Sequence, residues 1–168
     1  MKRLLLSGVL AVTAHAVDVS GTYENVGTVV GERPAALAEP VNFRGLLTLE
    51  FDRPLANARF ADVTRIVLTQ TDSTFKVSCR DAEGNEVWTG RWQRDLGYDF
   101  DAKQVKLLFS SKEKKDDGFL FQLSPAGDGN MLIVEITEIH AGPFGPTGKP
   151  AGLFAFERAP KKARQAGE

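Results

Sequence analysis

The chain has 168 residues, of which 42% are hydrophobic and 26% are charged, and it contains one Cys and two His. This is the length and composition of one soluble domain. Its 21 basic residues are balanced by 22 acidic ones, so the chain lacks the basic excess that neutralises a phosphate backbone, and nucleic-acid binding is disfavoured.

The first sixteen residues have the pattern of a secretory signal peptide. Lys2 and Arg3 are followed by an apolar stretch from Leu4 to Val12, and Ala14-His15-Ala16 places small residues where a signal peptidase cuts. The apolar stretch is shorter than the roughly 18 residues that span a bilayer, which disfavours a retained membrane anchor. We expect cleavage after Ala16 and a bacterial protein that is periplasmic or secreted.

Beyond this segment, apolar and polar residues alternate with a period of two, which indicates half-buried strands. In Thr74 to Arg80, for example, Phe75, Val77 and Cys79 share one face and the residues between them are polar. In chain order, we expect strands near residues 19–26, 45–51 (with Leu47, Leu49 and Phe51 on one face), 63–71, 74–80, 86–93, 104–111, 119–123, 131–139 and 152–158.

Short turns connect most of these strands. Thr71-Asp72-Ser73 and residues 81–85 have the composition of tight reversals, and residues 124–130 form a Gly-rich loop. Two longer stretches differ: Ala35 to Ala38 is expected to form one helical turn, and residues 141–151 hold too many Gly and Pro residues for a strand. The basic tail 159–168 is expected to be disordered.

About nine strands joined mostly by hairpins predict an all-β fold. We expect an antiparallel up-and-down β-barrel of about eight to ten strands over residues 17–158, because closure protects strand edges from pairing with other chains. A two-sheet β-sandwich is the alternative, since the number of strands does not separate the two architectures.

Gly21-Thr22-Tyr23, on the first expected strand, resembles the Gly-x-Trp opening of the lipocalin and fatty-acid-binding barrels, with Tyr in place of Trp. In that calycin-type group, the aromatic residue closes one barrel end and a basic residue near the end of the last strand packs across it. The resemblance implies a lipocalin-like fold in which Tyr23 and Arg158 form a closing pair. A guanidinium group over an aromatic ring gains cation–π energy. The opening is also similar to that of small bacterial exported proteins.

Candidate catalytic groups are few. After signal cleavage the chain keeps one histidine, His140, and Cys79 lies on the apolar face of its strand, where a thiol behaves as a small buried hydrophobe. No Gly-x-Ser-x-Gly elbow accompanies His140, and one Cys with one His cannot complete a zinc site. We therefore expect a protein that is not an enzyme and that needs no metal or cofactor.

Two kinds of polar segment resemble binding motifs only in part. Gly145 to Pro150 approaches a phosphate loop, but Pro143 stands where the first Gly of that motif belongs, and Pro150 replaces its hydroxyl residue. The acidic pairs supply too few ligands for calcium and are expected in solvated turns: Asp99 with Asp101, and Asp116 with Asp117.

The main functional feature is a set of large aromatic residues expected to face the interior. Five are candidate ligand-binding residues: Phe75, Trp88, Trp92, Phe109 and Phe121. Together with Phe51, Phe119, Phe154 and Phe156, they would either line a cavity for a small hydrophobic ligand or fill a narrow barrel. The leading hypothesis is a noncatalytic periplasmic barrel that binds a small apolar ligand. The alternative is a cell-envelope interaction module, an inhibitor or an assembly factor, that acts through the Gly/Pro-rich loop 141–151.

Overall fold

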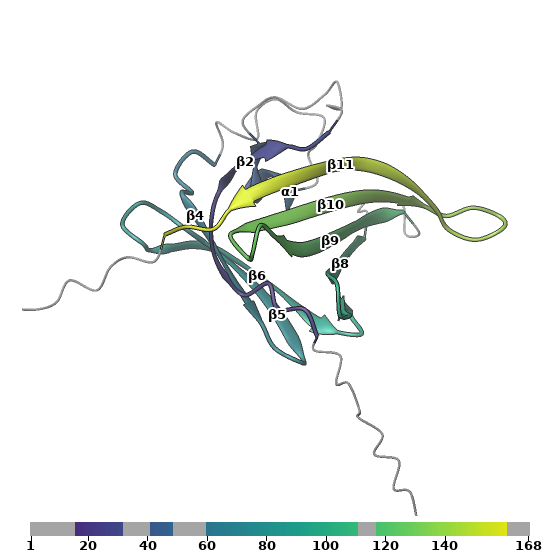
Figure 1. The fold of residues 1–168 in the computed structure, drawn as a ribbon. Helices are drawn as coiled ribbons and strands as arrows, with labels where there is room; N and C mark the ends of the chain where they lie inside the picture. Colours follow the sequence, from purple (N-terminus) through teal and green to yellow (C-terminus); the bar gives the residue numbers. More distant parts are fainter. Residues whose placement is uncertain (1–15, 32–40, 49–59, 111–116, 161–168) are drawn as a thin grey trace, which may run out of the picture.

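The computed structural model describes residues 16–31, 41–48, 60–110 and 117–160. Within these ranges, eleven strands form one sheet and a single helical turn, α1 (Phe43–Leu46), accompanies them (Figure 1). The strands are β1 (Gly21–Glu24), β2 (Val26–Val29), β3 (Val41–Asn42), β4 (Arg65–Gln70), β5 (Thr74–Arg80), β6 (Glu86–Arg94), β7 (Gly97–Phe100), β8 (Val105–Ser110), β9 (Gly118–Ala126), β10 (Met131–His140) and β11 (Thr147–Glu157).

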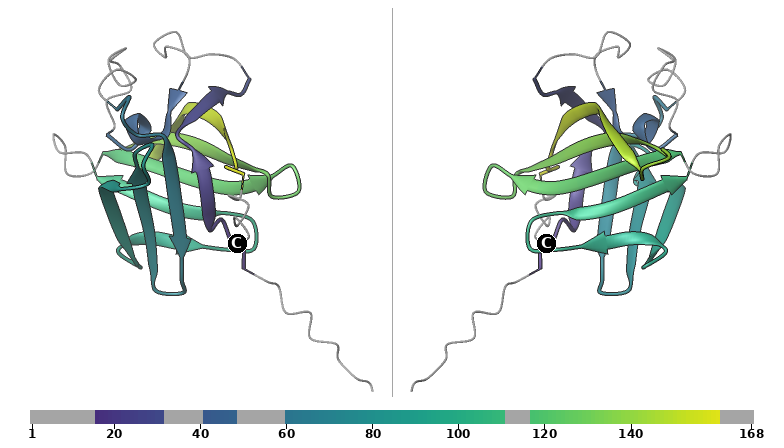
Figure 2. Two further views of the ribbon diagram at one scale, coloured as in Figure 1. Left: turned by 90° about the vertical axis from the view of Figure 1, so that its left-hand side faces the viewer. Right: turned by 90° about the vertical axis from the view of Figure 1, so that its right-hand side faces the viewer.

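The sheet has the order β1-β4-β5-β6-β7-β8-β9-β10-β11-β2-β3. From β4 to β11 each strand pairs with the next along the chain, and every pairing is antiparallel except the short parallel contact between β6 and β7. The sheet curls so that β4–β6 and β9–β11 form opposite walls (Figures 1 and 2). The expected all-β, barrel-like fold is confirmed, with eleven strands rather than eight to ten. One continuous sheet also disfavours the two-sheet sandwich.

The bent segment formed by β1 and β2 pairs with both the first and the last strand of the run from β4 to β11. β1 pairs with β4, whereas β2 pairs with β11, and only Asn25 separates β1 from β2. An isolated bridge joins Tyr23 of β1 to Arg158, just after β11. The backbone N–H of Ala159 also donates to the carbonyl of Thr22 at 2.9 Å. The first and last strands of the barrel therefore meet at this bend.

Asn25 holds the bend in place through both its backbone and its side chain. Its amide nitrogen Nδ2 donates to the Val63 carbonyl at 2.8 Å, and its Oδ1 accepts from the backbone N–H of Arg44 at 3.0 Å. Its backbone N–H donates to Thr64, and its carbonyl accepts from Phe43. Because Asn25 is fully buried, these four bonds supply the partners that water cannot.

The core lies on the inner face of the curled sheet, and in strands such as β4, β5 and β10 buried residues recur at alternate positions. In β5, Phe75, Val77 and Cys79 are fully buried, in the period of two that the sequence predicts. In β6, Gly90 leaves room for two neighbours: a Cβ atom there would lie 2.5 Å from the indole ring of Trp88 and 2.8 Å from that of Trp92. The two indole rings thus cover Gly90 on the inner face.

Three expectations about local structure are corrected. The strand expected near 45–51 is wrong over its described residues: α1 covers Gly45 and Leu46, and Leu47 is its C-cap. The helical turn forms because the Asn42 side chain accepts from the Gly45 N–H at 3.0 Å and caps it. Asp99, expected in a turn, lies within strand β7.

The third correction concerns the Gly/Pro-rich loop, because β11 already begins at Thr147. Thr147 to Pro150 pair with the end of β10, and a bulge follows at Ala151. In the described part of the chain, no strand pairs with the other side of this stretch. Pro150 is tolerated there because an edge position does not need its missing N–H.

Several expectations lie outside the described residues. They concern residues 1–15 of the expected signal peptide, the helical turn at 35–38, Leu49 and Phe51, Asp116, and residues 161–168 of the tail. None of the helical structure in the described ranges is long and apolar enough to cross a membrane.

Candidate functional site

The five candidate ligand-binding residues form one connected row on the inner face of β5, β6, β8 and β9. The ring centroids of Trp92 and Phe109 are 5.3 Å apart, and those of Phe109 and Phe121 are 4.6 Å apart. The ring centroid of Phe75 lies 6.5 Å from that of Trp92, and the indole rings of Trp88 and Trp92 both lie next to Gly90. These distances are typical of packed aromatic pairs. We call Phe75, Trp88, Trp92, Phe109 and Phe121 the aromatic row.

The members of the aromatic row differ in their exposure to solvent. Phe75 and Phe121 are fully buried, whereas Trp88, Trp92 and Phe109 are only partly buried against the core. Side chains that fill a close-packed interior lose contact with solvent. The three half-buried rings therefore form an inner wall that remains partly exposed.

A positive charge lies at one end of the aromatic row. Arg44 extends from α1 so that its guanidinium carbon is 4.0 Å from the ring centre of Trp88 and 4.7 Å from that of Phe60. Such stacking stabilises a cation over an aromatic face. The inner wall thus combines apolar rings with one guanidinium group.

Cys79 is not a prepared nucleophile. Its side chain is fully buried, and burial raises its pKa to about 12, although the nearby Arg44 charge acts in the opposite direction. The thiol is therefore protonated at neutral pH, and thiolate chemistry is unavailable to it.

His140 lies at the end of β10 between two carboxylates. Its Nδ1 is 3.6 Å from Asp117 Oδ2, and its Nε2 is 3.3 Å from Glu138 Oε1. The carboxylates face opposite ring nitrogens, so the three groups do not converge on one point as metal ligands must. No group of three metal-ligating side chains with suitable geometry occurs in the described residues.

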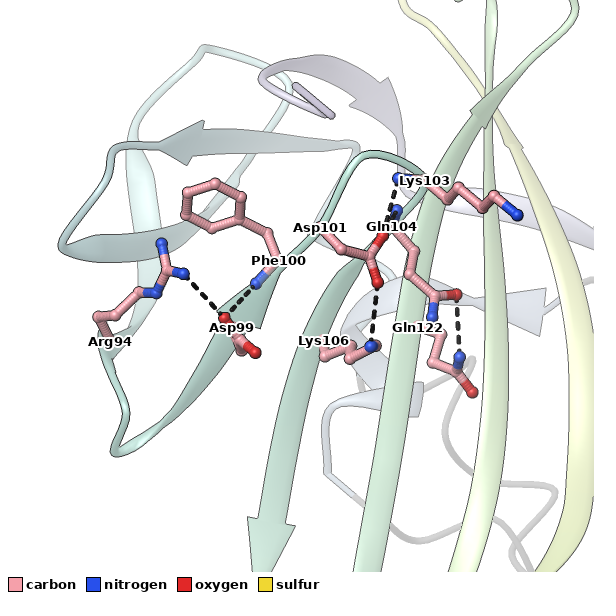
Figure 3. A network of polar contacts seen from close by, with 8 residues as sticks. All are labelled: Arg94, Asp99, Phe100, Asp101, Lys103, Gln104, Lys106 and Gln122. Atoms are coloured by element: carbon pink, nitrogen blue, oxygen red, sulfur yellow. Dashed lines mark hydrogen bonds and ion pairs between the residues drawn. The ribbon is translucent and has the colours of Figure 1, made fainter. Parts of the chain in front are cut away.

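The acidic residues near β7 are occupied by structural contacts (Figure 3). Asp101 Oδ1 accepts from the backbone N–H groups of Lys103 and Gln104, and Oδ2 pairs with Lys106 at 3.0 Å. The N–H of Lys103 and the Lys106 ammonium group lower the pKa of Asp101. Asp99 pairs with Arg94 at 3.1 Å. Asp101 therefore stabilises the β7–β8 turn, and Asp99 links β7 to the end of β6.

Arg158 lies over Tyr23 at the junction of the first and last strands. Its guanidinium carbon is 5.6 Å from the tyrosine ring centre, and its Nη groups donate to the carbonyls of Ser20 and Gly129. A Cβ atom on Gly21 would lie 2.5 Å from Arg158 Nη2. Glycine in Gly21-Thr22-Tyr23 therefore leaves the space that the guanidinium group occupies.

Comparisons with known proteins found no relative of this chain. No protein-family model, curated protein or solved structure matches the chain. The similarity to lipocalins consequently rests on Gly21-Thr22-Tyr23, Arg158 and the barrel-like sheet.

Sequence reasoning missed two residues that shape the site, Arg44 and Asn25. Arg44 reaches the aromatic row from α1, in a segment whose alternating apolar residues predict a strand. The available signal was Asn42, an N-cap residue placed three positions before Gly45. Asn25 carries no signal of its own, because an asparagine between two strands equally indicates an ordinary turn.

Proposed function

We propose that the protein is a noncatalytic, lipocalin-like barrel of the bacterial periplasm that binds a small hydrophobic ligand along the aromatic row. The observation that supports this most directly is the partial exposure of Trp88, Trp92 and Phe109 on the inner wall. Burying these rings against a ligand removes apolar surface from water, at about 25 cal/mol per Å². The indole and phenyl faces suit a flat or flexible apolar body.

The proposed location rests on the pattern of residues 1–16. A positive start, a short apolar stretch and small residues at the cleavage point direct export. The fold is compatible with an oxidising compartment because Cys79, the only cysteine, is buried and unpaired.

Nile red, an uncharged dye that fluoresces in apolar sites, tests this proposal. Trp92→Ala and Phe109→Ala should each weaken dye binding by about tenfold, which corresponds to about 1.4 kcal/mol of lost contact. Leu108→Ala is the matched control, because Leu108 is the neighbour of Phe109 on the exposed outer face of β8. Fluorescence titration measures the affinities.

Equal weakening by Leu108→Ala, or no saturable binding to the unmodified protein, would contradict the proposal. Native mass spectrometry of protein purified from its own host gives an independent readout. A bound apolar molecule that is lost in Trp92→Ala would support the aromatic row as its site.

A second function, a cell-envelope interaction module, is favoured by one observation. Phe144 is fully exposed in the loop between β10 and β11, which projects from the body of the sheet (Figure 1). An aromatic side chain on a protruding loop is a typical anchor for a partner's pocket. Under this alternative the protein is an inhibitor or assembly factor that acts through the loop.

Phe144→Ala separates this alternative from ligand binding. Because the side chain contacts water on all sides, its removal should change the free energy of unfolding by less than about 0.5 kcal/mol. A co-purification experiment from the periplasmic fraction should lose its partner in this variant and keep it in Leu96→Ala, another exposed apolar change. Retention of every partner after Phe144→Ala would exclude the loop as the anchor.

A further inference from the structure

The outer face of the barrel carries a pocket that is separate from the aromatic row. It has a volume of about 460 Å³ and lies over β1, β4 and the turn after β5. Its polar lining consists of Thr22, Glu24, Thr64, Arg65, Arg80 and Asp81. This volume falls within the range of small-molecule sites.

Two arginines face each other across strands in this pocket. Arg65 of β4 is the direct cross-strand partner of Arg80 of β5, and like charges in that arrangement destabilise a sheet. Neither guanidinium group has an ion-pair partner among the described residues; Arg80 makes only a long contact of 3.5 Å to the Gly84 carbonyl. Glu24 faces Arg65 and Glu86 faces Arg80 on the flanking strands, but neither carboxylate is within ion-pair distance of these two guanidinium groups in the described structure, so their N–H donors remain available to a ligand.

A second pair of like charges in the sheet has a neighbouring counter-charge. Lys76 and Arg91 are also direct cross-strand partners, but Lys76 pairs with Glu86 at 3.0 Å. In the pocket, the Asp81 carboxylate oxygens accept from Asn85 at 2.7 and 3.0 Å, and Asp81 forms no ion pair with either arginine in the described structure. Glu24 lines the pocket opposite Arg65 and forms no ion pair in the described structure.

We propose that this pocket binds a small oxyanion, a carboxylate or phosphate group held between Arg65 and Arg80. Guanidinium groups present planar forks of N–H donors that match the oxygens of such anions, and these charge-assisted bonds are stronger than neutral ones. The anion bridges the two guanidinium groups, neither of which forms an ion pair with another described residue. Thr22 places a hydroxyl group in the same lining.

The test titrates the purified protein with inorganic phosphate and, separately, with succinate, at constant ionic strength set with sodium chloride. NMR chemical shifts of the backbone amides of Thr64 and Gly84 report binding at the pocket. We expect saturable shifts with at least one probe, and the probe that binds identifies the source as a phosphate or a carboxylate. Arg65→Gln and Arg80→Gln should each weaken the affinity by about tenfold or more.

Two further variants make the test specific. Arg91→Gln removes the same charge from the neighbouring strand outside the pocket and should leave the affinity unchanged. Glu24→Gln should tighten anion binding, because it removes a negative charge from the lining. Equal losses in Arg91→Gln and Arg65→Gln, or shifts that never saturate with either probe, would overturn the proposal.

Thermal unfolding without added anion separates a binding defect from a folding defect. Arg65→Gln and Arg80→Gln each remove the repulsion between the two guanidinium groups together with the attraction to the facing Glu24 or Glu86, so each should change the free energy of unfolding by less than about 1 kcal/mol. Saturating phosphate or succinate, whichever binds, should raise the melting temperature of the unmodified protein and not that of the two variants. A loss of several kcal/mol without anion would show that the arginines serve the fold and would count against the binding site.

Discussion

Replacing Tyr23 by Ala should lower the free energy of unfolding by about 3–5 kcal/mol. The ring is 2% exposed, lies under Arg158, and donates its hydroxyl group to the Val19 carbonyl at 3.0 Å. Truncation leaves a cavity at the junction of the first and last strands. Urea denaturation followed by tryptophan fluorescence measures the loss, and Tyr23→Phe, which removes only the hydroxyl group, should cost about 0.5–1.5 kcal/mol.

The same junction predicts coupling between Tyr23 and Arg158. Arg158→Ala should destabilise the protein by about 0.5–2 kcal/mol, the range of a cation–π contact at different degrees of exposure, and should leave Nile red affinity nearly unchanged. In a double-mutant cycle the two losses should not add, since each variant removes the same contact. Strict additivity would show that the stacked pair does not contribute to closure.

Asn25→Ala should destabilise the protein by about 1–6 kcal/mol, because it leaves one buried and one partly buried group without partners, at up to about 1–3 kcal/mol each. These groups are the Val63 carbonyl and the backbone N–H of Arg44. Asn25→Asp keeps an acceptor for Arg44 but cannot donate to Val63, and it buries a charge, so it should also be strongly destabilising. The free energy of unfolding in urea measures both variants.

Asn85→Ala is the control for the Asn25 variants. Asn85 also bonds through its side chain, to Asp81 at 3.0 Å, but it is exposed. Water can replace that bond, so the loss should stay below about 1 kcal/mol. Similar losses for Asn25→Ala and Asn85→Ala would mean that the bend between β1 and β2 does not depend on the buried amide.

The strands with clear two-residue alternation were predictable, and the segments stabilised by single side chains were not. In β5 the apolar face is apparent because Phe75, Val77 and Cys79 alternate with polar residues. α1 depends on one cap from Asn42, which competes with the strand-like pattern that follows it. Strand β11 extends through Pro150 because its edge is unpaired within the described residues, and sequence alone does not reveal which strand is at an edge.

The residues of the candidate site could be predicted from the sequence, but their exposure to solvent could not. Trp88 and Trp92 share a face with Gly90 between them, so the alternation alone assigns both rings to the interior. Their partial exposure depends on how the sheet curls, which is a property of eleven strands together. Arg65 and Arg80 lie on separate strands, and only the register of β4 against β5 brings them together.

The junction at Tyr23 also has a consequence for how the chain folds. Pairings from β4 to β11 join neighbours along the chain, but the contact of Arg158 with Ser20 spans 138 residues. Contacts of such long sequence separation carry the largest entropy of loop closure and slow folding. A nascent chain can thus form most of its hairpins early and cannot make this junction until Arg158 emerges. Until then, β1 and the most recently formed strand of the growing sheet present free edges on which another copy of the chain can add a strand.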